Sequence, residues 1–275
     1  MGIDVGSVST NLVLIDEENN LAYKKYLRTQ GRPLDILKSG IKELAEEFGE
    51  DNILGVGTTG SGRYLASVLI GADVIKNEIS CHAVAALNYN PATRTVIEIG
   101  GQDSKIVIIK DGIVVDFAMN TVCAAGTGSF LDRQALRLGM EISDFGTYAL
   151  NSSNPVRIAG RCAVFAESDM IHKQQLGHNQ EDIISGLCDA LVRNYLSNIA
   201  KGKDLKTPIL FQGGVAANKG IKKSFEKELF QEIYVPPNFD VMGAIGAAIL
   251  SKAAVRQNGN TKFKEIGRAS CRERV

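Results

Sequence analysis

Short apolar runs separated by polar turns open the chain, a pattern typical of consecutive β-strands. The predicted strands cover residues 3–5, 12–15 and 22–28. Apolar residues then recur every three or four positions, which places them on one face of an α-helix. These residues are Leu34, Leu37, Ile41, Leu44, Ala45 and Phe48, and Gly49 follows them. We expect a further strand at 53–58 and two short helical stretches up to about Asn88.

The same order of elements starts again after about Asn88. Apolar runs predict strands at 95–99, 105–109 and 113–118. A Gly-Gly turn separates the first two strands, and Asp111-Gly112 between the last two is a favoured hairpin turn. Both halves therefore have the order strand, glycine turn, strand, tight turn, strand. This repetition predicts an internal duplication, with two similar lobes facing a shared cleft.

The remaining apolar pattern predicts helices and one more strand. The helices are expected at 182–199, 216–229 and 240–250, and the strand at 209–211. Strands and helices mixed in this way predict an α/β fold. The expected lobes are 1–88 with 241–255, and 89–240, followed by a tail at 256–275. From about residue 265 the tail resembles vector-derived sequence, so it and Cys271 carry no functional argument.

Composition and charge exclude several classes of partner. The 275 residues are 44% hydrophobic and 23% charged, as in an ordinary globular protein. Basic and acidic residues balance at 31 each, so no basic surface indicates nucleic acid or a membrane surface as a partner. No apolar run reaches the roughly 18 residues of a membrane span, and we expect a cytoplasmic protein. The five cysteines form no Cys-x-x-Cys pair, which argues against a disulfide framework and a single-chain zinc site.

A first candidate phosphate-binding turn lies at the start of the chain, over residues 2–10. Asp4 stands on a predicted buried strand and can hold Mg²⁺ directly or through water. The glycine turn after it lets backbone N–H groups approach phosphate oxygens. The candidate phosphate-binding residues are Gly6, Ser7, Ser9 and Thr10. Because Gly-Ser turns between strands are common, a purely structural turn is the alternative.

A second candidate turn opens the second lobe, over residues 98–105. It places Glu98, Gln102 and Asp103 around the glycine pair Gly100-Gly101. Two such turns in the same relative order support phosphate binding at both. The alternative is a hairpin that needs positive φ at the two glycines.

A third glycine turn lies between the predicted strand at 209–211 and the following helix. Its residues Gly213, Gly214, Val215 and Asn218 offer bare backbone against which a flat adenine or ribose could lie. Further on, glycines and alanines share one helix at 240–248, as a close helix crossing at a hinge requires.

These motifs resemble the acetate and sugar kinase, Hsp70 and actin superfamily, over about residues 1–255. Members share two phosphate turns, an adenosine turn and two connecting helices in this order. The resemblance implies a two-lobed, ribonuclease H-like α/β fold with a nucleotide cleft between duplicated lobes. The P-loop pattern Gly-x-x-x-x-Gly-Lys-Ser/Thr does not occur in the chain.

Two cysteine-bearing segments narrow the resemblance. The segments 120–130 and 160–169 each place a cysteine, Cys123 and Cys162, just before a predicted helix. Together with residues 98–103 they resemble the ATP-dependent activators of 2-hydroxyacyl-CoA dehydratases and the related ATPase subunits of benzoyl-CoA reductase. Gly126 and Gly128, in the first of these segments, are further candidate cofactor-binding residues.

The chemistry of the two cysteines is compatible with binding an iron–sulfur cluster. A [4Fe–4S] cluster takes four thiolates, and the chain offers two well-placed ones, so a two-fold homodimer would supply the other two. A helix N-terminus lowers the pKa of a thiol and favours an anionic cluster. The alternative is that these cysteines are small buried residues. That interpretation stands for Cys81 and Cys188, which lie inside apolar helical runs.

The resemblance implies a function for the whole chain. An activator of this family accepts an electron from ferredoxin or flavodoxin, binds ATP, docks on its dehydratase and passes the electron to that partner. ATP hydrolysis to ADP makes the uphill transfer proceed. The resemblance implies that Asp4 and Asp103 organise Mg²⁺ and that Glu98 or Gln102 orients the attacking water.

Two other functions fit the same fold. One is a sugar or carboxylate kinase, and the other is a nucleotide-gated binding protein of the Hsp70 or actin type. The cysteine pair argues against both, because neither needs thiols at two helix starts. Lys105 and Arg161 could meet phosphate or cluster charge, although solvated or paired side chains are the alternative. The histidines have no metal-ligand spacing and no assigned role.

Overall fold

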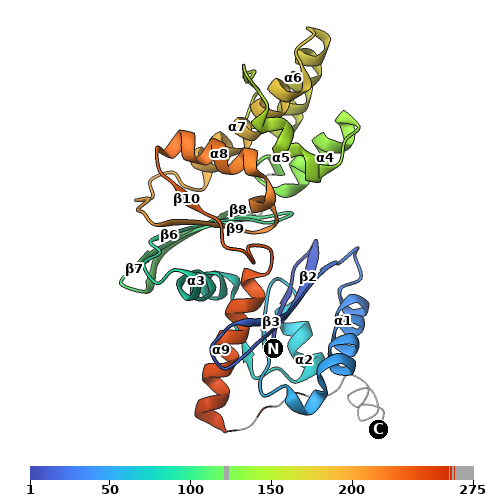
Figure 1. The fold of residues 1–275 in the computed structure, drawn as a ribbon, viewed down its shortest axis with the longest axis vertical. Helices are drawn as coiled ribbons and strands as arrows, with labels where there is room; N and C mark the ends of the chain where they lie inside the picture. Colours follow the sequence, from blue (N-terminus) through green and yellow to red (C-terminus); the bar gives the residue numbers. More distant parts are fainter. Residues whose placement is uncertain (121–123, 260, 262, 264–275) are drawn as a thin grey trace. The chain divides into compact units, whose positions relative to one another are not determined.

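The computed structural model describes residues 1–120, 124–259, 261 and 263. The chain forms two compact units. Unit 1 combines Met1–Pro91 with Val241–Val275, and unit 2 is Ala92–Asp240. Figure 1 shows that each unit has its own sheet and its own helices.

Unit 1 is built on a five-stranded sheet of order β3-β2-β1-β4-β5. Its strands are β1 (Gly2–Val5), β2 (Ser9–Ile15), β3 (Leu21–Arg28), β4 (Gly57–Thr59) and β5 (Val74–Ile75). The central strand β1 pairs antiparallel with β2 and parallel with β4. The helices are α1 (Pro33–Phe48), α2 (Arg63–Ile70), α3 (Glu78–Tyr89) and α9 (Met242–Asn258), with a short 3₁₀ turn at Glu50–Asn52.

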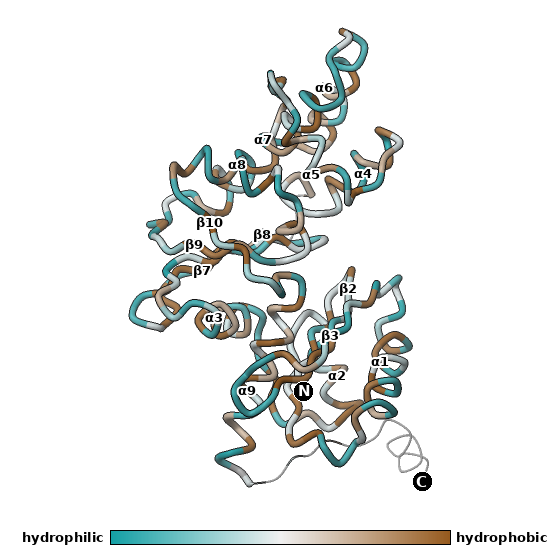
Figure 2. Tube along the Cα trace, in the orientation of Figure 1, coloured by the Kyte–Doolittle hydropathy of each residue, from teal (hydrophilic) through white to brown (hydrophobic). Residues whose placement is uncertain are grey.

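Helix α1 follows the predicted pattern from end to end. Pro33 stands at its start, where a missing N–H costs nothing, and Gly49 ends it with φ 79°. Leu37, Ile41 and Leu44 are buried, while the polar positions between them are exposed. Figure 2 shows hydrophobic and hydrophilic residues alternating along this helix. The one-sided spacing therefore defines both the helix and its buried face.

The predicted strand at 53–58 is wrong in its bounds, because β4 begins only at Gly57. Backbone groups upstream have other partners. Ile53 N–H donates to Glu50 O at 3.0 Å, and Val56 N–H donates to Asp73 Oδ2 at 2.7 Å. A backbone held by a turn and a side chain does not join the strand ladder.

Helix α9 packs very closely against the rest of unit 1. A β carbon added at Gly246 would overlap the backbone carbonyl of Cys81 on α3. On the sheet side, a β carbon at Gly2 or Gly57 would overlap the backbone of α9. The small residues of this helix are therefore needed for close packing, as predicted for a helix crossing.

Unit 2 repeats the topology of unit 1 with the order β10-β9-β6-β7-β8. Its strands are β6 (Thr95–Ile99), β7 (Ser104–Lys110), β8 (Ile113–Asn120), β9 (Ile209–Gln212) and β10 (Ile233–Tyr234). The first strand is again central, with an antiparallel neighbour on one side and a parallel one on the other. Asp111 and Gly112 both have positive φ, 53° and 76°, which is the predicted hairpin turn. The duplication is confirmed at the level of strand order.

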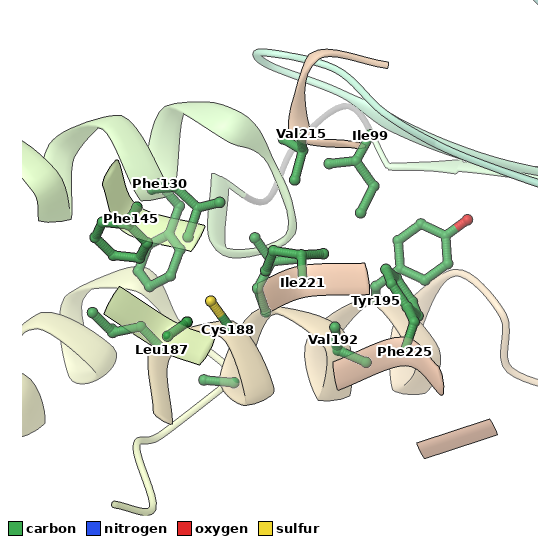
Figure 3. Close-up of a cluster of buried hydrophobic side chains, with 14 of the residues drawn as sticks. Ile99, Phe130, Phe145, Leu187, Cys188, Val192, Tyr195, Val215, Ile221 and Phe225 are labelled. Carbon is green, nitrogen blue, oxygen red and sulfur yellow. The ribbon is translucent and has the colours of Figure 1, made fainter. Parts of the chain in front are cut away.

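The helices of unit 2 are α4 (Gly128–Leu138), α5 (Ile142–Leu150), α6 (Ala163–Gln175), α7 (Gln180–Asn198) and α8 (Lys219–Leu229). Short 3₁₀ turns occupy Ala124–Gly126 and Gly214–Ala217. Helix α7 is buried along most of its length, as the pattern predicted. Figure 3 shows its residues Leu187, Val192 and Tyr195 inside one apolar cluster.

Helix α8 starts later than predicted, at Lys219 instead of residue 216. The reason is a side-chain cap. Asn218 Oδ1 accepts hydrogen bonds from Gly220 N at 2.9 Å and Ile221 N at 3.1 Å, which satisfies two backbone donors at the helix start. Within the described part of the chain, no helix is both long enough and apolar enough to cross a membrane.

Candidate functional site

The two predicted phosphate turns have the same backbone hydrogen bond. Gly6 N–H donates to Ser9 O at 2.8 Å in unit 1, and Gly100 N–H donates to Asp103 O at 3.0 Å in unit 2. Each turn joins the central strand of its sheet to the next strand. The duplication therefore extends from strand order to the geometry of the candidate turns.

In unit 1 the carboxylate of Asp4 is enclosed by glycines. A β carbon added at Gly60 would lie 2.5 Å from Asp4 Oδ1, and one added at Gly243 would overlap Oδ2. The same position at Gly243 lies 3.3 Å from Cε1 of His82, which is buried. Sequence reasoning gave no role to Gly60 or His82 and only a helix-packing role to Gly243, because all three are far from Asp4 along the chain.

Two more polar side chains border Asp4. In sheet register Asp4 is opposite Asn11 on β2 and Thr59 on β4, and both are buried. The Cys81 thiol is near both Thr59 and Asp4. Burial raises the pKa of this thiol to about 12, the charge of Asp4 also raises it, and a hydrogen bond with Thr59 lowers it. Asp4 thus lies among oxygen-bearing side chains, as a Mg²⁺ site requires. The hydroxyls of the first turn differ: Thr10 is buried and pairs with Thr29, whereas Ser7 is exposed.

In unit 2 the second turn does not have the positive φ that a purely structural hairpin would need. Neither Gly100 nor Gly101 adopts the left-handed conformation. Space at position 100 is tight, because an added β carbon would lie 3.0 Å from Asp103 Oδ1 and 3.2 Å from Glu98 Oε1. The turn is therefore closed in by the carboxylates that the sequence singled out.

A buried lysine holds these carboxylates. Lys105 Nζ lies 3.0 Å from Glu98 Oε2 and 2.9 Å from Asp103 Oδ2. Lys105 and Glu98 are only 2% and 4% exposed, whereas the Asp103 side chain is 33% exposed and Gln102 is exposed. The paired alternative for Lys105 is confirmed. It places a compensating positive charge where two acids approach one another.

The third glycine turn meets the second in space. Gly213 has φ 88°, and a β carbon there would lie 2.7 Å from Glu98 Oε1. A β carbon at Gly128 would lie 3.2 Å from Val215 Cγ2 and 3.0 Å from Gly100 O. Gly100 and Gly213 thus lie against Glu98, and Gly128 lies between Gly100 and Val215, all within unit 2. The oxygen of Asn218 caps α8.

The start of α4 is bound directly to the second turn. Gly128 N–H donates to Gly100 O and Ser129 N–H to Gly101 O, both at 2.8 Å. The hydroxyl of Ser129 also donates to Gly101 O at 2.5 Å. Any displacement of this turn therefore acts on the helix that follows Cys123 in the sequence.

Cys162 occupies the N-cap position of α6, as predicted. Its side chain makes no capping hydrogen bond and is half-buried, so the thiol is accessible at the positive end of a 13-residue helix. Cys123 lies outside the described residues. Among those that are described, no group of three or more His, Cys, Asp or Glu residues is placed to hold a metal ion.

A groove of about 770 Å³ adjoins Cys162. Arg157, Arg161 and Arg193 line it, with Glu228 as an opposing charge. Arg161 is exposed, in agreement with the solvated alternative. Arg193 donates to Ile158 O at 2.7 Å and thereby holds the backbone before Cys162.

The other two described cysteines are core residues, as predicted. Cys188 points into the apolar cluster of unit 2 (Figure 3), and burial raises its pKa. Cys81 is fully buried in unit 1. Neither thiol is available to a metal at the surface.

Two α/β units with the same strand order and the same glycine turn define an actin-like and sugar-kinase-like ATPase fold. A family model confirms and narrows this class: residues 1–251 match the BadF/BadG/BcrA/BcrD ATPase family. The chain belongs to that family. The resemblance stated from the motifs is therefore confirmed.

Named relatives include dehydratase activators. The chain is 34% identical over 253 residues to the (R)-2-hydroxyglutaryl-CoA dehydratase activating ATPase of Acidaminococcus fermentans, covering 90% of this chain and 95% of the relative. A solved structure of the 2-hydroxyisocaproyl-CoA dehydratase activator from Clostridium difficile, with bound ADPNP, has a TM-score of 0.84 and 32% identity. That comparison covers 94% of this chain and 96% of the other.

A more distant structure shares the fold alone. A ROK family glucokinase from Streptomyces griseus has a TM-score of 0.55 and 13% identity, over 92% of this chain and 98% of that chain. It supports the sugar-kinase-like architecture and carries no argument about activity.

Proposed function

We propose that this chain is an ATP-hydrolysing activator that delivers electrons to a 2-hydroxyacyl-CoA dehydratase or a related CoA-substrate enzyme. The observation that carries the proposal is the accessible Cys162 thiol at the N-terminus of α6. Neither a small-molecule kinase nor a nucleotide-gated binding protein needs a thiol there. The named activators among the relatives support the same function.

The cysteines of two copies would hold one [4Fe–4S] cluster. Cys123 and Cys162 of each chain would be its ligands, and the cluster, when bound, supplies one-electron chemistry. Cys162 is half-buried at the N-terminus of α6, where a cluster ligand would be reachable from the surface. Exposed apolar side chains flank this position: Val164 and Phe165 on α6 are 67% and 66% exposed. A second copy of the chain would cover such side chains, which supports a homodimer.

The glycine turns and their acids would bind the nucleotide. We propose that Asp4 and Asp103 organise Mg²⁺ and that amides of the first and second turns bind phosphate oxygens. The backbone around Gly213 and Gly214 would bind the adenosine. The oxygen of Asn218 caps α8, so Asn218 would add a contact only through its amide nitrogen, which has no hydrogen-bond partner within the described part of the chain.

The Lys105 ion pair supports Gln102 over Glu98 as the residue that orients the attacking water. Glu98 Oε2 is bound to Lys105, and Oε1 faces the closely packed Gly100 and Gly213. Gln102 is exposed on the same turn and has an amide that can orient water. Glu98 would then act on the shape of the turn.

Ferredoxin or flavodoxin would be the electron donor.

Iron content is the first test of this proposal. The protein is purified without oxygen, reconstituted with iron and sulfide, and assayed for iron and for ATP hydrolysis. Wild type is expected to bind about four irons per dimer, and Cys123→Ala and Cys162→Ala are each expected to lose them. Cys188→Ala is the matched control, because this thiol is buried in the core and should not affect iron.

Two results would contradict this proposal or favour the kinase alternative. An iron-free wild-type protein that still hydrolyses ATP after reconstitution would contradict the electron-transfer proposal. Hydrolysis that then depends on an added sugar or carboxylate would indicate the kinase alternative.

A further inference from the structure

A buried asparagine on α7 lies between the two cysteine-bearing segments of unit 2. Asn194 is 1% exposed, and its Nδ2 donates to Gly160 O at 2.6 Å, two residues before Cys162. This bond fixes the orientation of the amide, because only the nitrogen can donate to a carbonyl. Its oxygen must therefore face the other way.

The oxygen faces the segment that follows Cys123. A β carbon added at Gly126 would lie 2.9 Å from Asn194 Oδ1, so backbone and amide are in close contact. Asn194 Oδ1 is buried and has no hydrogen-bond partner among the residues that the structure describes. A buried acceptor without a donor is rare in proteins, and leaving it unpaired costs free energy.

The Gly126 segment is connected to the second turn on its other side. Gly128 and Ser129 donate to the carbonyls of Gly100 and Gly101, as described above. A continuous series of contacts thus leads from the turn through the start of α4 to Asn194 and on to Gly160. All of it lies within unit 2.

Helix α7 provides a fixed reference for this series. The hydroxyl of Tyr195, next to Asn194, donates to Lys105 O at 2.7 Å and attaches the helix to β7. Arg193, on the other side, holds Ile158 O. The helix backbone on both sides of Asn194 is therefore held, so a movement of Gly126 acts on the Asn194 side chain and not on the whole helix.

We propose that Asn194 is a positioning residue that transmits movement of the Gly100–Gly101 turn, through the first turn of α4, to the Cys162 segment. The inference rests on the proposed function, in which this turn binds nucleotide and Cys162 binds the cluster. Asn194 joins the two cysteine-bearing segments, and the sequence motifs alone do not identify it.

The test reads the environment of Cys162 without any cluster. In full-length apoprotein carrying Cys123→Ser and Cys271→Ser, the labelling rate of Cys162 with Ellman's reagent is measured with and without Mg·ADPNP. Cys81 and Cys188 are buried, and burial raises the pKa of both thiols, so they label slowly. The nucleotide is expected to change the Cys162 rate by about fivefold or more.

Asn194→Leu should abolish this nucleotide effect while nucleotide affinity stays unchanged. Asn198→Leu, exposed at the end of the same helix, is the matched control and should keep the effect. Gly126→Ala is a second variant that acts from the opposite side, and Asn194→Asp keeps the side-chain shape but removes the donor to Gly160. Because these residues share one contact, the effects of Gly126→Ala and Asn194→Leu should not add.

The outcomes separate the two proposals. A full nucleotide effect in folded Asn194→Leu or Asn194→Asp would overturn the role of Asn194 and leave the proposed function intact. If the reference protein binds Mg·ADPNP without any change at Cys162, the coupling itself is overturned. Iron binding, measured separately, reports on the cluster in either case.

Discussion

Replacing Lys105 by methionine is expected to lower the free energy of unfolding by about 3–5 kcal/mol. The ammonium of Lys105 is the charge that compensates Glu98, which is 4% exposed, and Asp103. Without it, a buried carboxylate has lost its ion-pair partner, which costs far more than the loss of a surface ion pair. Urea unfolding measured for wild type and variant gives the difference.

Two further variants make the cause specific. Lys105→Met with Glu98→Gln should recover part of the loss, because the second change removes the uncompensated charge. Lys110→Met, at the exposed end of the same strand, is the control and should change stability by less than about 0.5 kcal/mol. A Lys105→Met protein as stable as this control would show that other groups satisfy Glu98.

The first three strands of each unit could be predicted along the chain, because they follow from local patterns. Alternating apolar runs fix the strands, and positive φ at Asp111 and Gly112 fixes one hairpin. The helix at 33–48 was predicted from its apolar spacing. The errors occur where a side chain takes over backbone hydrogen bonds, as Asp73 does before β4 and Asn218 does before α8.

The candidate site could be predicted only where its residues share a motif. Asp4, Glu98 and Cys162 each stand beside glycines or at a helix start in the sequence. Gly60, Gly243 and His82 lie around Asp4 but come from three other segments, so no local pattern indicates their contact with it. Asn194 looks like an ordinary residue of a core helix, and only its contacts with Gly160 and Gly126 distinguish it.

Lys105 shows why spacing alone leaves a role open. Its position after the second glycine turn is compatible with phosphate binding. Its side chain, however, is buried against two carboxylates of the same turn. Which partner a charged residue takes depends on burial and on the distance to its neighbours, and the sequence specifies neither.

Gly243→Ala is expected to reduce ATP hydrolysis by about 10²-fold, because it displaces the carboxylate proposed to organise Mg²⁺. Gly243 is the second residue of α9, and its added β carbon would overlap Asp4 Oδ2. Alanine is otherwise favoured over glycine in a helix by about 1 kcal/mol, so the helix itself does not require glycine here. Initial hydrolysis rates measured across a range of Mg²⁺ concentrations should show a higher Mg²⁺ requirement.

Gly40→Ala in α1 is the matched control for this change. Its β carbon would meet the ends of the Leu12 and Leu27 side chains at 2.9 Å and 3.1 Å, and these flexible groups can give way. Hydrolysis should therefore remain near the wild-type rate. Wild-type hydrolysis in a folded Gly243→Ala protein would remove Asp4 from the proposed magnesium site.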